Sequence, residues 1–304
     1  MDDANTRPYH LPQDAVWFIT GCSSGIGLAL AQLVAKTSNR VVATARNPAA
    51  LAGIPDGPNV FKHALDVTSI PSIDVALQAA LSKFGRIDVV VNNAGHTLVG
   101  DTEAAGDEES RALMDINFWG MVDVTKRALG IMRDDNSKTG QQGGVILNVS
   151  SVGGWVGYPA GAFYHATKFA MEGWTEAVAK ELPLDWNIHL CNIEPGGVST
   201  NFASTSLKPM AKRHPAYADP GYPSNVVLGY MADPQMQKTW AKPSDMAAAM
   251  YHIASRGQRI PIRVPLGPDS YSMIIADLEK NQKLFEELKD LSMGVGQAAV
   301  AAFM

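Results

Sequence analysis

The 304-residue chain has few cysteines and no long hydrophobic runs. Two cysteines, Cys22 and Cys191, cannot crosslink a protein of this size, so reduced thiols are the simpler interpretation. Apolar stretches such as Ala15–Thr20 are far too short to span a bilayer. The first residues, MDDANTRPYHLPQD, are polar and partly acidic, unlike a signal peptide. We therefore expect a cytoplasmic protein that has no membrane as a partner.

Clustered positive charge is also absent from the sequence. The 25 basic and 30 acidic residues give a net charge of −5, and no long run of Lys or Arg occurs, which argues against a nucleic-acid partner. The seven histidines and two cysteines show no metal-ligand spacing, so we expect no metal site. With 46% apolar and 18% charged residues, the composition excludes a disordered chain and a coiled coil.

Short runs rich in valine and isoleucine alternate along the chain with stretches of helical periodicity. This alternation predicts an α/β protein with a doubly wound, Rossmann-type parallel sheet that helices cover on both faces. The expected strands are Val16–Thr20, Arg40–Ala45, Val60–Leu65, Ile87–Asn92, Gly144–Ser150 and Ile188–Ile193, with Ile262–Leu266 as an edge candidate. The expected helices are Ile26–Ala35, Ser72–Phe84, Asp107–Arg133, Phe163–Leu182, Ser244–Ser255 and Ser270–Leu291.

The domain organisation follows from where this alternation starts and stops. We expect an N-terminal surface arm over residues 1–13, one domain over 14–291 and an apolar C-terminal tail over 292–304. The Pro-, Gly-, Tyr- and Met-rich segment 200–242 reads as an irregular substrate-binding lid or as a surface insertion that contacts no ligand. An adaptable apolar wall could come from His214, Tyr217, Tyr222, Tyr230, Met231, Met236 and Trp240. The tail could dock on a partner subunit, close over the site or be disordered.

A glycine-rich turn, Gly21-Cys22-Ser23-Ser24-Gly25-Ile26-Gly27, joins the first strand to the first helix. Glycines let the backbone turn sharply and approach a pyrophosphate, and the helix start offers it free N–H groups. We expect Gly21, Ser23, Ser24, Gly25, Ile26 and Gly27 to bind a dinucleotide cofactor. The alternatives are glycines needed for turn geometry alone, and a Cys22 that is a small turn residue rather than a reactive thiol.

The end of the second strand bears on which cofactor is bound. NAD-preferring sites usually place an acidic residue here for the ribose 2′-hydroxyl, whereas an arginine accommodates a 2′-phosphate. The sequence has Ala45 and Arg46 in this region and no acid. We therefore predict NADP as the cofactor, with Arg46 as its contact. The alternative is that Arg46 is a solvated surface charge.

Tyr164 and Lys168 lie four residues apart in an expected helix, so both side chains share one face. A phenol with its ordinary pKa near 10 is a poor acid or base at neutral pH, and an adjacent ammonium would lower that pKa. Ser151 follows the expected strand Gly144–Ser150, at the edge of the sheet where ligands of open α/β sheets bind. The three residues can handle the proton of a carbonyl or alcohol oxygen.

Together these residues resemble the short-chain dehydrogenase/reductase family, in its compact single-domain, NADP-preferring, ketoreductase-like branch. The resemblance covers about residues 14–270, in the family's order of motifs. These motifs are Thr20-Gly21-x₃-Gly25-x-Gly27, Asp66, Asn92-Asn93-Ala94-Gly95, Asn117, Ser151, Tyr164-x₃-Lys168 and Pro195-Gly196.

The resemblance implies a role for each matching residue. Tyr164 would be the general acid/base, Lys168 would lower its pKa and bind the nicotinamide ribose, Ser151 would hold the substrate carbonyl, and Asn117 would hold a water of a proton relay. Further cofactor contacts would come from Asp66, Val67, Asn93, Ala94, Gly95, Pro195, Gly196, Val198 and Thr200. The family fold has seven parallel strands, and its homodimers or homotetramers form through the two long helices.

These expectations lead to an NADP-dependent oxidoreductase that interconverts a ketone or aldehyde and an alcohol. The lid composition suggests a bulky, mostly apolar substrate such as a polyketide, terpenoid, steroid or aromatic ketone. An isomerase or dehydratase that uses the same Tyr–Lys pair remains an alternative, as does a non-catalytic NADP(H)-binding regulatory or scaffolding protein. Substrate identity, direction and stereochemistry are not readable from the sequence.

Overall fold

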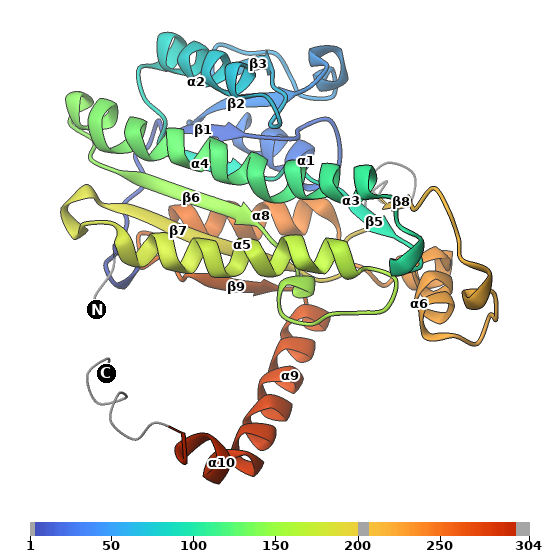
Figure 1. Cartoon of the computed structure of the whole chain (residues 1–304). Coiled ribbons are helices and arrows are strands. Elements are labelled where there is room, and N and C mark those ends of the chain that lie inside the picture. The colour runs from blue at the N-terminus through green and yellow to red at the C-terminus, as the bar shows by residue number, and fades with distance from the viewer. Residues whose placement is uncertain (1–3, 200–206, 296–304) are drawn as a thin grey trace.

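A seven-stranded, all-parallel sheet forms the centre of the molecule, in the order β3-β2-β1-β4-β6-β7-β9 (Figure 1). The computed structural model describes residues 4–199 and 207–295. The strands are β1 (Val16–Ile19), β2 (Arg40–Ala45), β3 (Val60–Ala64), β4 (Val89–Asn92), β6 (Gly144–Val149), β7 (Ile188–Pro195) and β9 (Arg263–Leu266). The predicted fold class is confirmed, and the proline-flanked β9 lies at the edge of the sheet.

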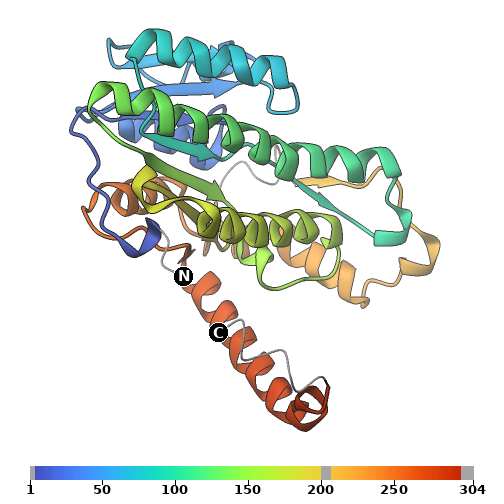
Figure 2. The ribbon, with the colours of Figure 1, turned by 60° about the vertical axis from the view of Figure 1, so that its left-hand side comes forward.

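Helices cover both faces of this sheet, and alternate residues of each strand supply the two cores (Figures 1 and 2). On β1, Trp17 and Ile19 pack with α1 (Gly25–Val34) and α8 (Pro243–Ser255). Val16 and Phe18 point to the other face. That face is covered by α2 (Ile70–Phe84), α4 (Gly120–Gly130) and α5 (Ala162–Glu181). The central strands are buried on both sides, which explains their unbroken apolar sequence.

The long helix expected over Asp107–Arg133 is interrupted in the structure. The first part, α3 (Asp107–Met114), passes into a wider π-helical turn at Asp115–Trp119 before α4 begins. A second such turn, Ile131–Asp135, follows α4. Wider turns of this kind often occur at functional sites, and the first one contains Asn117.

The expectation of an irregular segment between Glu194 and Pro243 is wrong for part of the described residues. β7 continues through Pro195, and the segment contains β8 (Leu207–Pro209), α6 (Pro223–Ala232) and α7 (Pro234–Gln237). Prolines supply the first residue of both helices, where the missing N–H costs nothing. β8 pairs in parallel with β5 (Thr97–Val99), a short strand that the sequence analysis missed.

The N-terminal arm is more firmly attached than the sequence suggests. Asn5 is buried, and its side-chain amide donates to the carbonyls of Leu190 (2.6 Å) and Ile260 (2.8 Å). Tyr9 is also buried, with its ring 5.2 Å from that of His189. The arm therefore closes the amino end of β7 rather than lying loosely on the surface.

The C-terminal helix α9 (Pro268–Glu287) projects away from the body of the molecule and is followed by α10 (Lys289–Met293) (Figures 1 and 2). It begins two residues before the predicted Ser270. Large apolar side chains are exposed on this projecting part, including Phe285 (68%) of α9 and Leu291 (69%) of α10. Among the described residues, no helix is long and apolar enough to cross a membrane.

Candidate active site

Four neighbouring strands, β1, β4, β6 and β7, end at the same edge of the sheet because they are parallel. The loops that follow these strands carry the glycine turn, the Asn93–Gly95 turn, Ser151 and Pro195-Gly196. Figure 1 shows β5, β8 and α6 lying beyond this edge. Parallel order therefore gathers segments that are up to about 170 residues apart in the sequence into one place.

The glycine turn has a backbone shape that fits a phosphate group. Gly21 (φ +71°) and Gly25 (φ +58°) adopt the left-handed region that favours glycine. A side chain at Gly27 would collide with the Asn93 amide and the Gly21 carbonyl. α1 begins at Gly25, and its N-cap Ser24 makes no side-chain capping hydrogen bond. The cradle and the uncapped helix start together suit an anionic ligand.

Asn93 and Thr20 hold this turn in place from the next loop. The Asn93 amide donates to the carbonyls of Thr20 (2.9 Å) and Gly21 (3.0 Å). The Thr20 hydroxyl accepts from the backbone N–H groups of Asn93 (3.0 Å) and Ala94 (2.9 Å). Asn93 thus braces the glycine turn through its side chain. Gly95 lies against Asn117, where a side chain would contact the Asn117 Oδ1.

Arg46 and Asp66 follow the ends of the paired strands β2 and β3. The Asp66 carboxylate accepts from the Thr68 hydroxyl (2.7 Å) and N–H (2.9 Å). These bonds, with a smaller contribution from the Arg46 charge, lower the pKa of Asp66. Arg46 itself is exposed. Val67, which follows Asp66, is buried against Gly120. An exposed guanidinium beside the glycine turn is available to an anionic ligand.

Asn117 fastens the π-helical turn to the loop after β4. Its amide donates to the His96 carbonyl (2.9 Å) and the Thr167 hydroxyl (3.1 Å), while its Oδ1 accepts from the His96 N–H (3.0 Å). The side chain is fully buried. Thr167 directly precedes Lys168 on α5, so Asn117 connects the loop to the helix that carries Tyr164 and Lys168.

Lys168 is buried on α5, with its Nζ donating to the Val149 carbonyl at 2.7 Å. Burial lowers the pKa of Lys168 to about 8, and the Glu172 carboxylate partly opposes this shift. The Nζ lies 5.7 Å from the centroid of the Tyr164 ring. The two side chains are therefore adjacent, as their spacing predicts.

The Tyr164 phenol lies near hydroxyls from two other segments. Burial raises its pKa, and the hydroxyls of Ser151 and Thr97 oppose this effect. Ser151 also accepts from the Gly153 N–H at 3.0 Å, which fixes the start of its loop. No pattern in the sequence predicted that Thr97, on β5, lies beside the phenol.

The backbone around Pro195-Gly196 is held from the C-terminal helix. The Gly197 N–H donates to the Asp269 carboxylate (2.6 Å), and the Gly196 N–H donates to the Leu266 carbonyl (3.0 Å). A side chain at Gly196 would collide with Asp269. Val198 makes an isolated parallel bridge to Ala241. The expected contact Thr200 lies outside the described residues.

Comparison with known proteins agrees with this geometry. A family model described as short chain dehydrogenase matches residues 15–211. The chain belongs to the short-chain dehydrogenase family. An oxidoreductase of Penicillium decumbens, calM, is 42% identical over 297 residues, which is 96% of each chain. A 3-ketodihydrosphingosine reductase of Bacteroides thetaiotaomicron is 33% identical over 84% of this chain and 89% of its own.

Solved structures give the same assignment. A short-chain dehydrogenase from Streptomyces avermitilis matches with a TM-score of 0.80 and 31% identity, over 93% of this chain and 100% of its own. A 3-ketoacyl-(acyl-carrier-protein) reductase from Brucella melitensis, solved with NADH, has a TM-score of 0.68 and 27% identity over 84% and 98% of the two chains. This dehydrogenase is therefore an enzyme, an oxidoreductase of the short-chain type.

The described part of the segment 200–242 of this dehydrogenase reaches the candidate site at two points. Met210 is buried with Leu98 and Leu113 against Phe163 and Tyr164. Its N–H donates to the Val99 carbonyl at 2.8 Å, next to the pairing of β5 and β8.

The second contact is made by the buried Asp101, whose carboxylate accepts hydrogen bonds from the Nε (2.6 Å) and Nη2 (3.0 Å) of Arg213. Of the aromatic residues of this segment, Trp240 packs on Gly197, whereas Tyr222 and Tyr230 are about half exposed. These contacts are decided by tertiary structure, and no pattern in the sequence marks Asp101 or Met210.

Proposed function

We propose that this enzyme interconverts a ketone or aldehyde and an alcohol, with Tyr164 as the general acid/base. One observation carries the proposal: the Ser151 hydroxyl and the partly buried Tyr164 phenol adjoin each other at the edge of the sheet that carries the glycine cradle. Two hydroxyls of this kind can hold one substrate oxygen between them. Lys168 lies beside the phenol and Asn117 anchors the same helix.

A nicotinamide cofactor would supply or accept the hydride in this reaction. The glycine cradle would hold its pyrophosphate, and Asp66, Val67 and the Asn93–Gly95 turn would line its adenosine half. We infer a preference for NADP from Arg46, which is exposed and has no competing acidic neighbour at the end of β2. The Brucella structure contains NADH, so relatives alone do not carry this preference.

In the direction of carbonyl reduction, Tyr164 would donate its phenol proton to the carbonyl oxygen. Burial raises the pKa of this phenol, so the form that donates is present at neutral pH. Ser151 would accept no proton in this step but orients the oxygen. Lys168 would return a proton to Tyr164, and a water held at Asn117 would link Lys168 to solvent.

An apolar carbonyl compound is the substrate class that the surroundings of Tyr164 support. Leu98, Leu113, Phe163 and Met210 pack beside the phenol, and Met210 belongs to the lid segment. Two relatives named as reductases of 3-keto compounds with long chains or carriers agree with this class. We propose that residues 200–242 form the substrate lid and that the enzyme works as a homodimer or homotetramer.

The test is the carbonyl-dependent oxidation of NADPH, followed by absorbance with a panel of bulky ketones and aldehydes. Tyr164→Phe removes only the hydroxyl and is expected to lower turnover at least about a hundredfold, while NADPH binding by fluorescence is retained. A variant that keeps wild-type turnover would reject the role of Tyr164. NADPH binding without consumption on any substrate would favour an isomerase or a non-catalytic protein.

A further inference from the structure

A cluster of buried charged side chains lies directly behind the candidate active site and has no place in the mechanism above. Glu172 follows Lys168 by one turn of α5, and Glu194 directly precedes Pro195 at the end of β7. Arg263 reaches both from the neighbouring strand β9, where it pairs in register with Asn192. We call Glu172, Glu194 and Arg263 the Glu–Arg cluster. It lies where the helix of Tyr164 meets the strand of Pro195-Gly196.

Direct contacts join these elements. The Arg263 Nε donates to Glu172 at 3.1 Å and lies 3.9 Å from Glu194, and its Nη2 donates to Glu176 at 2.7 Å. The Asn192 amide donates to the same Glu172 oxygen at 2.7 Å. Glu172 and Glu194 are almost completely buried. Burying charged groups costs desolvation free energy, which close ion pairs and hydrogen bonds offset. These contacts link α5 to β7 and β9.

The cluster also holds the loop that carries Ser151. Trp155 follows the short turn that Ser151 begins, and its indole N–H donates to Glu194 at 2.8 Å. The Arg263 guanidinium lies 5.1 Å from the centroid of the Trp155 ring. A cation over an indole face and a charge-assisted hydrogen bond at its edge fix the ring in two directions. The Ser151 loop is thus fastened to the strand and helix beneath it.

Two buried carboxylates of this cluster face the same guanidinium. Glu172 and Glu194 both lie against Arg263, whereas the third carboxylate, Glu176, is also paired with Lys180. Within the described structure, one oxygen of Glu172 and one of Glu194 are buried without a hydrogen-bond partner. Neither carboxylate can donate to the other, but a carboxyl proton on either would satisfy both oxygens.

Titration behaviour agrees with a proton at this place. Burial and the Glu172 charge raise the pKa of Glu194 to about 8, and burial also raises the pKa of Glu172. The other titratable neighbours are Lys168 on α5 and Cys191 on β7, whose buried thiol has a raised pKa and stays neutral. The Arg263 charge partly opposes both carboxyl shifts but does not cancel them.

We propose that the Glu–Arg cluster is a positioning device for the catalytic groups, completed by one proton shared between Glu172 and Glu194. It holds the Ser151 loop, through Trp155, at a set position relative to Tyr164 and Lys168. None of its members touches the reacting atoms. The catalytic part of the inference rests on the proposed function, whereas the shared proton does not.

The shared proton is tested by thermal unfolding of the full-length protein as a function of pH. Glu194→Gln keeps an oxygen for the Trp155 indole and offers an N–H to Glu172, so it resembles the protonated acid at every pH. A carboxyl whose pKa is higher in the folded than in the unfolded chain destabilises the fold progressively as pH rises between the two values. The variant should therefore gain in melting temperature over wild type as pH rises from about 4.5 to about 8, and the difference should then level off.

A constant difference between the two proteins across this range would overturn the shared proton. The measurement needs neither substrate nor cofactor, so it stands even if carbonyl reduction is never observed. Glu176→Gln is the matched control because Glu176 contacts the same guanidinium but is partly exposed and has a lowered pKa. It should not gain in melting temperature over this pH range.

The positioning role is tested by the kinetics of Trp155→Phe and of Glu194→Ala against Glu194→Gln. Trp155→Phe keeps an aromatic face for Arg263 but loses the indole N–H, and kcat should fall about tenfold with little change in the KM for NADPH. Glu194→Gln should retain kcat near that of wild type at neutral pH, and Glu194→Ala should not. Wild-type kcat in Trp155→Phe, or equal kcat in both Glu194 variants, would reduce the cluster to a structural element.

Discussion

Arg46 is the exposed side chain on which the proposed preference for NADP depends. No acidic residue adjoins it in the sequence at the end of β2, and its charge reaches Asp66 at the end of the next strand. The Tyr164 phenol shows how far surroundings modify a residue. The spacing of Tyr164 and Lys168 correctly predicted that they are adjacent, and burial raises the pKa of the phenol. Spacing in the sequence determines which side chains are adjacent on a helix, whereas burial in the fold changes their pKa values.

Arg46→Ala should weaken NADPH binding about tenfold to a hundredfold, because a charged hydrogen bond to the 2′-phosphate is worth about 1.5–3 kcal/mol. NADH lacks that phosphate, so its affinity should change little and serves as the internal control. Fluorescence titration with both cofactors measures this difference. Equal losses for NADPH and NADH would reject the proposed contact.

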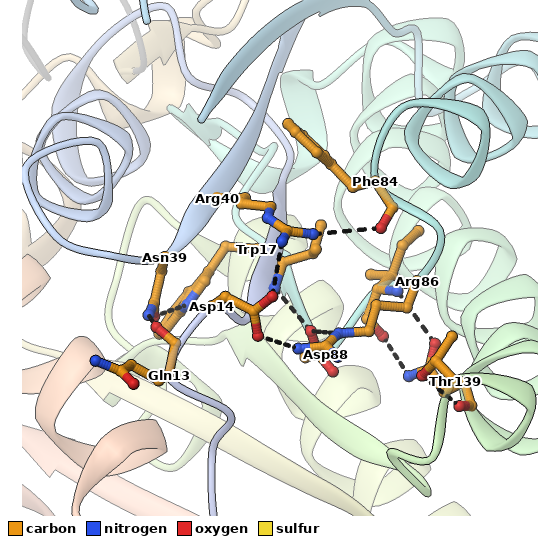
Figure 3. Close-up of polar contacts among 12 residues, drawn as sticks. Gln13, Asp14, Trp17, Asn39, Arg40, Phe84, Arg86, Asp88 and Thr139 are labelled. Carbon is orange, nitrogen blue, oxygen red and sulfur yellow. Dashed lines mark hydrogen bonds and ion pairs between the residues drawn. The ribbon is translucent and has the colours of Figure 1, made fainter. Parts of the chain in front are cut away.

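At the scale of elements, the two edges of the sheet have different roles. The carboxyl edge carries the candidate active site, and the opposite edge is fastened by an ion-pair network before β1 and β4 (Figure 3). The buried Asp88 accepts from the Val16 N–H (2.7 Å) and from the Arg86 Nε (2.9 Å). Asp14 then bridges Arg86 and Arg40. This network sets the start of the two central strands.

Arg86→Leu should lower the free energy of unfolding by about 2–3 kcal/mol, because it leaves the buried Asp88 carboxylate without its cation. Urea denaturation measures the loss, and cofactor affinity should be unaffected because this edge is far from the glycine turn. Lys138→Leu, which removes an exposed ion pair with Asp135, is the control and should cause no measurable change. A similar stability for both variants would show that the network does not hold the strands.

At the scale of the whole molecule, several surfaces of the described residues expose large apolar side chains to water. One lies over the long helices, with Trp119 (52% exposed) and Phe169 (47% exposed). Another is the projecting C-terminal segment, with Phe285 on α9 and Leu291 on α10. From the family resemblance we propose that assembly uses the long helices, which include α5.

Phe169→Asp should convert the proposed homo-oligomer to a smaller species, because it places a charge in an apolar interface. Light scattering coupled to size-exclusion chromatography measures the mass, and Phe285→Asp is the matched variant on α9. A mass change in Phe285→Asp alone would transfer the interface to the projecting helix. A wild-type protein that is already monomeric would reject the assembly.

The order of strands and helices, the glycine turn, the Tyr–Lys pair and the family could all be read from the sequence, since each depends on periodicity or on spacing within one segment. The sequence missed β5, the wider turn at Asn117 and the helices of the segment after β7. It also gave no sign of Thr97 beside the phenol or of Asp269 behind Gly197. Such contacts join residues that are far apart in the chain.

Local pattern therefore determined which elements form and which chemistry-bearing residues follow them. Only the tertiary structure decided which side chains are buried together, and hence their charge states. The Glu–Arg cluster is an example, because Glu172, Glu194 and Arg263 are unremarkable singly and acquire a shared proton only when three elements bring them out of water. Burial depends on the whole fold, so no short segment of the sequence predicts it.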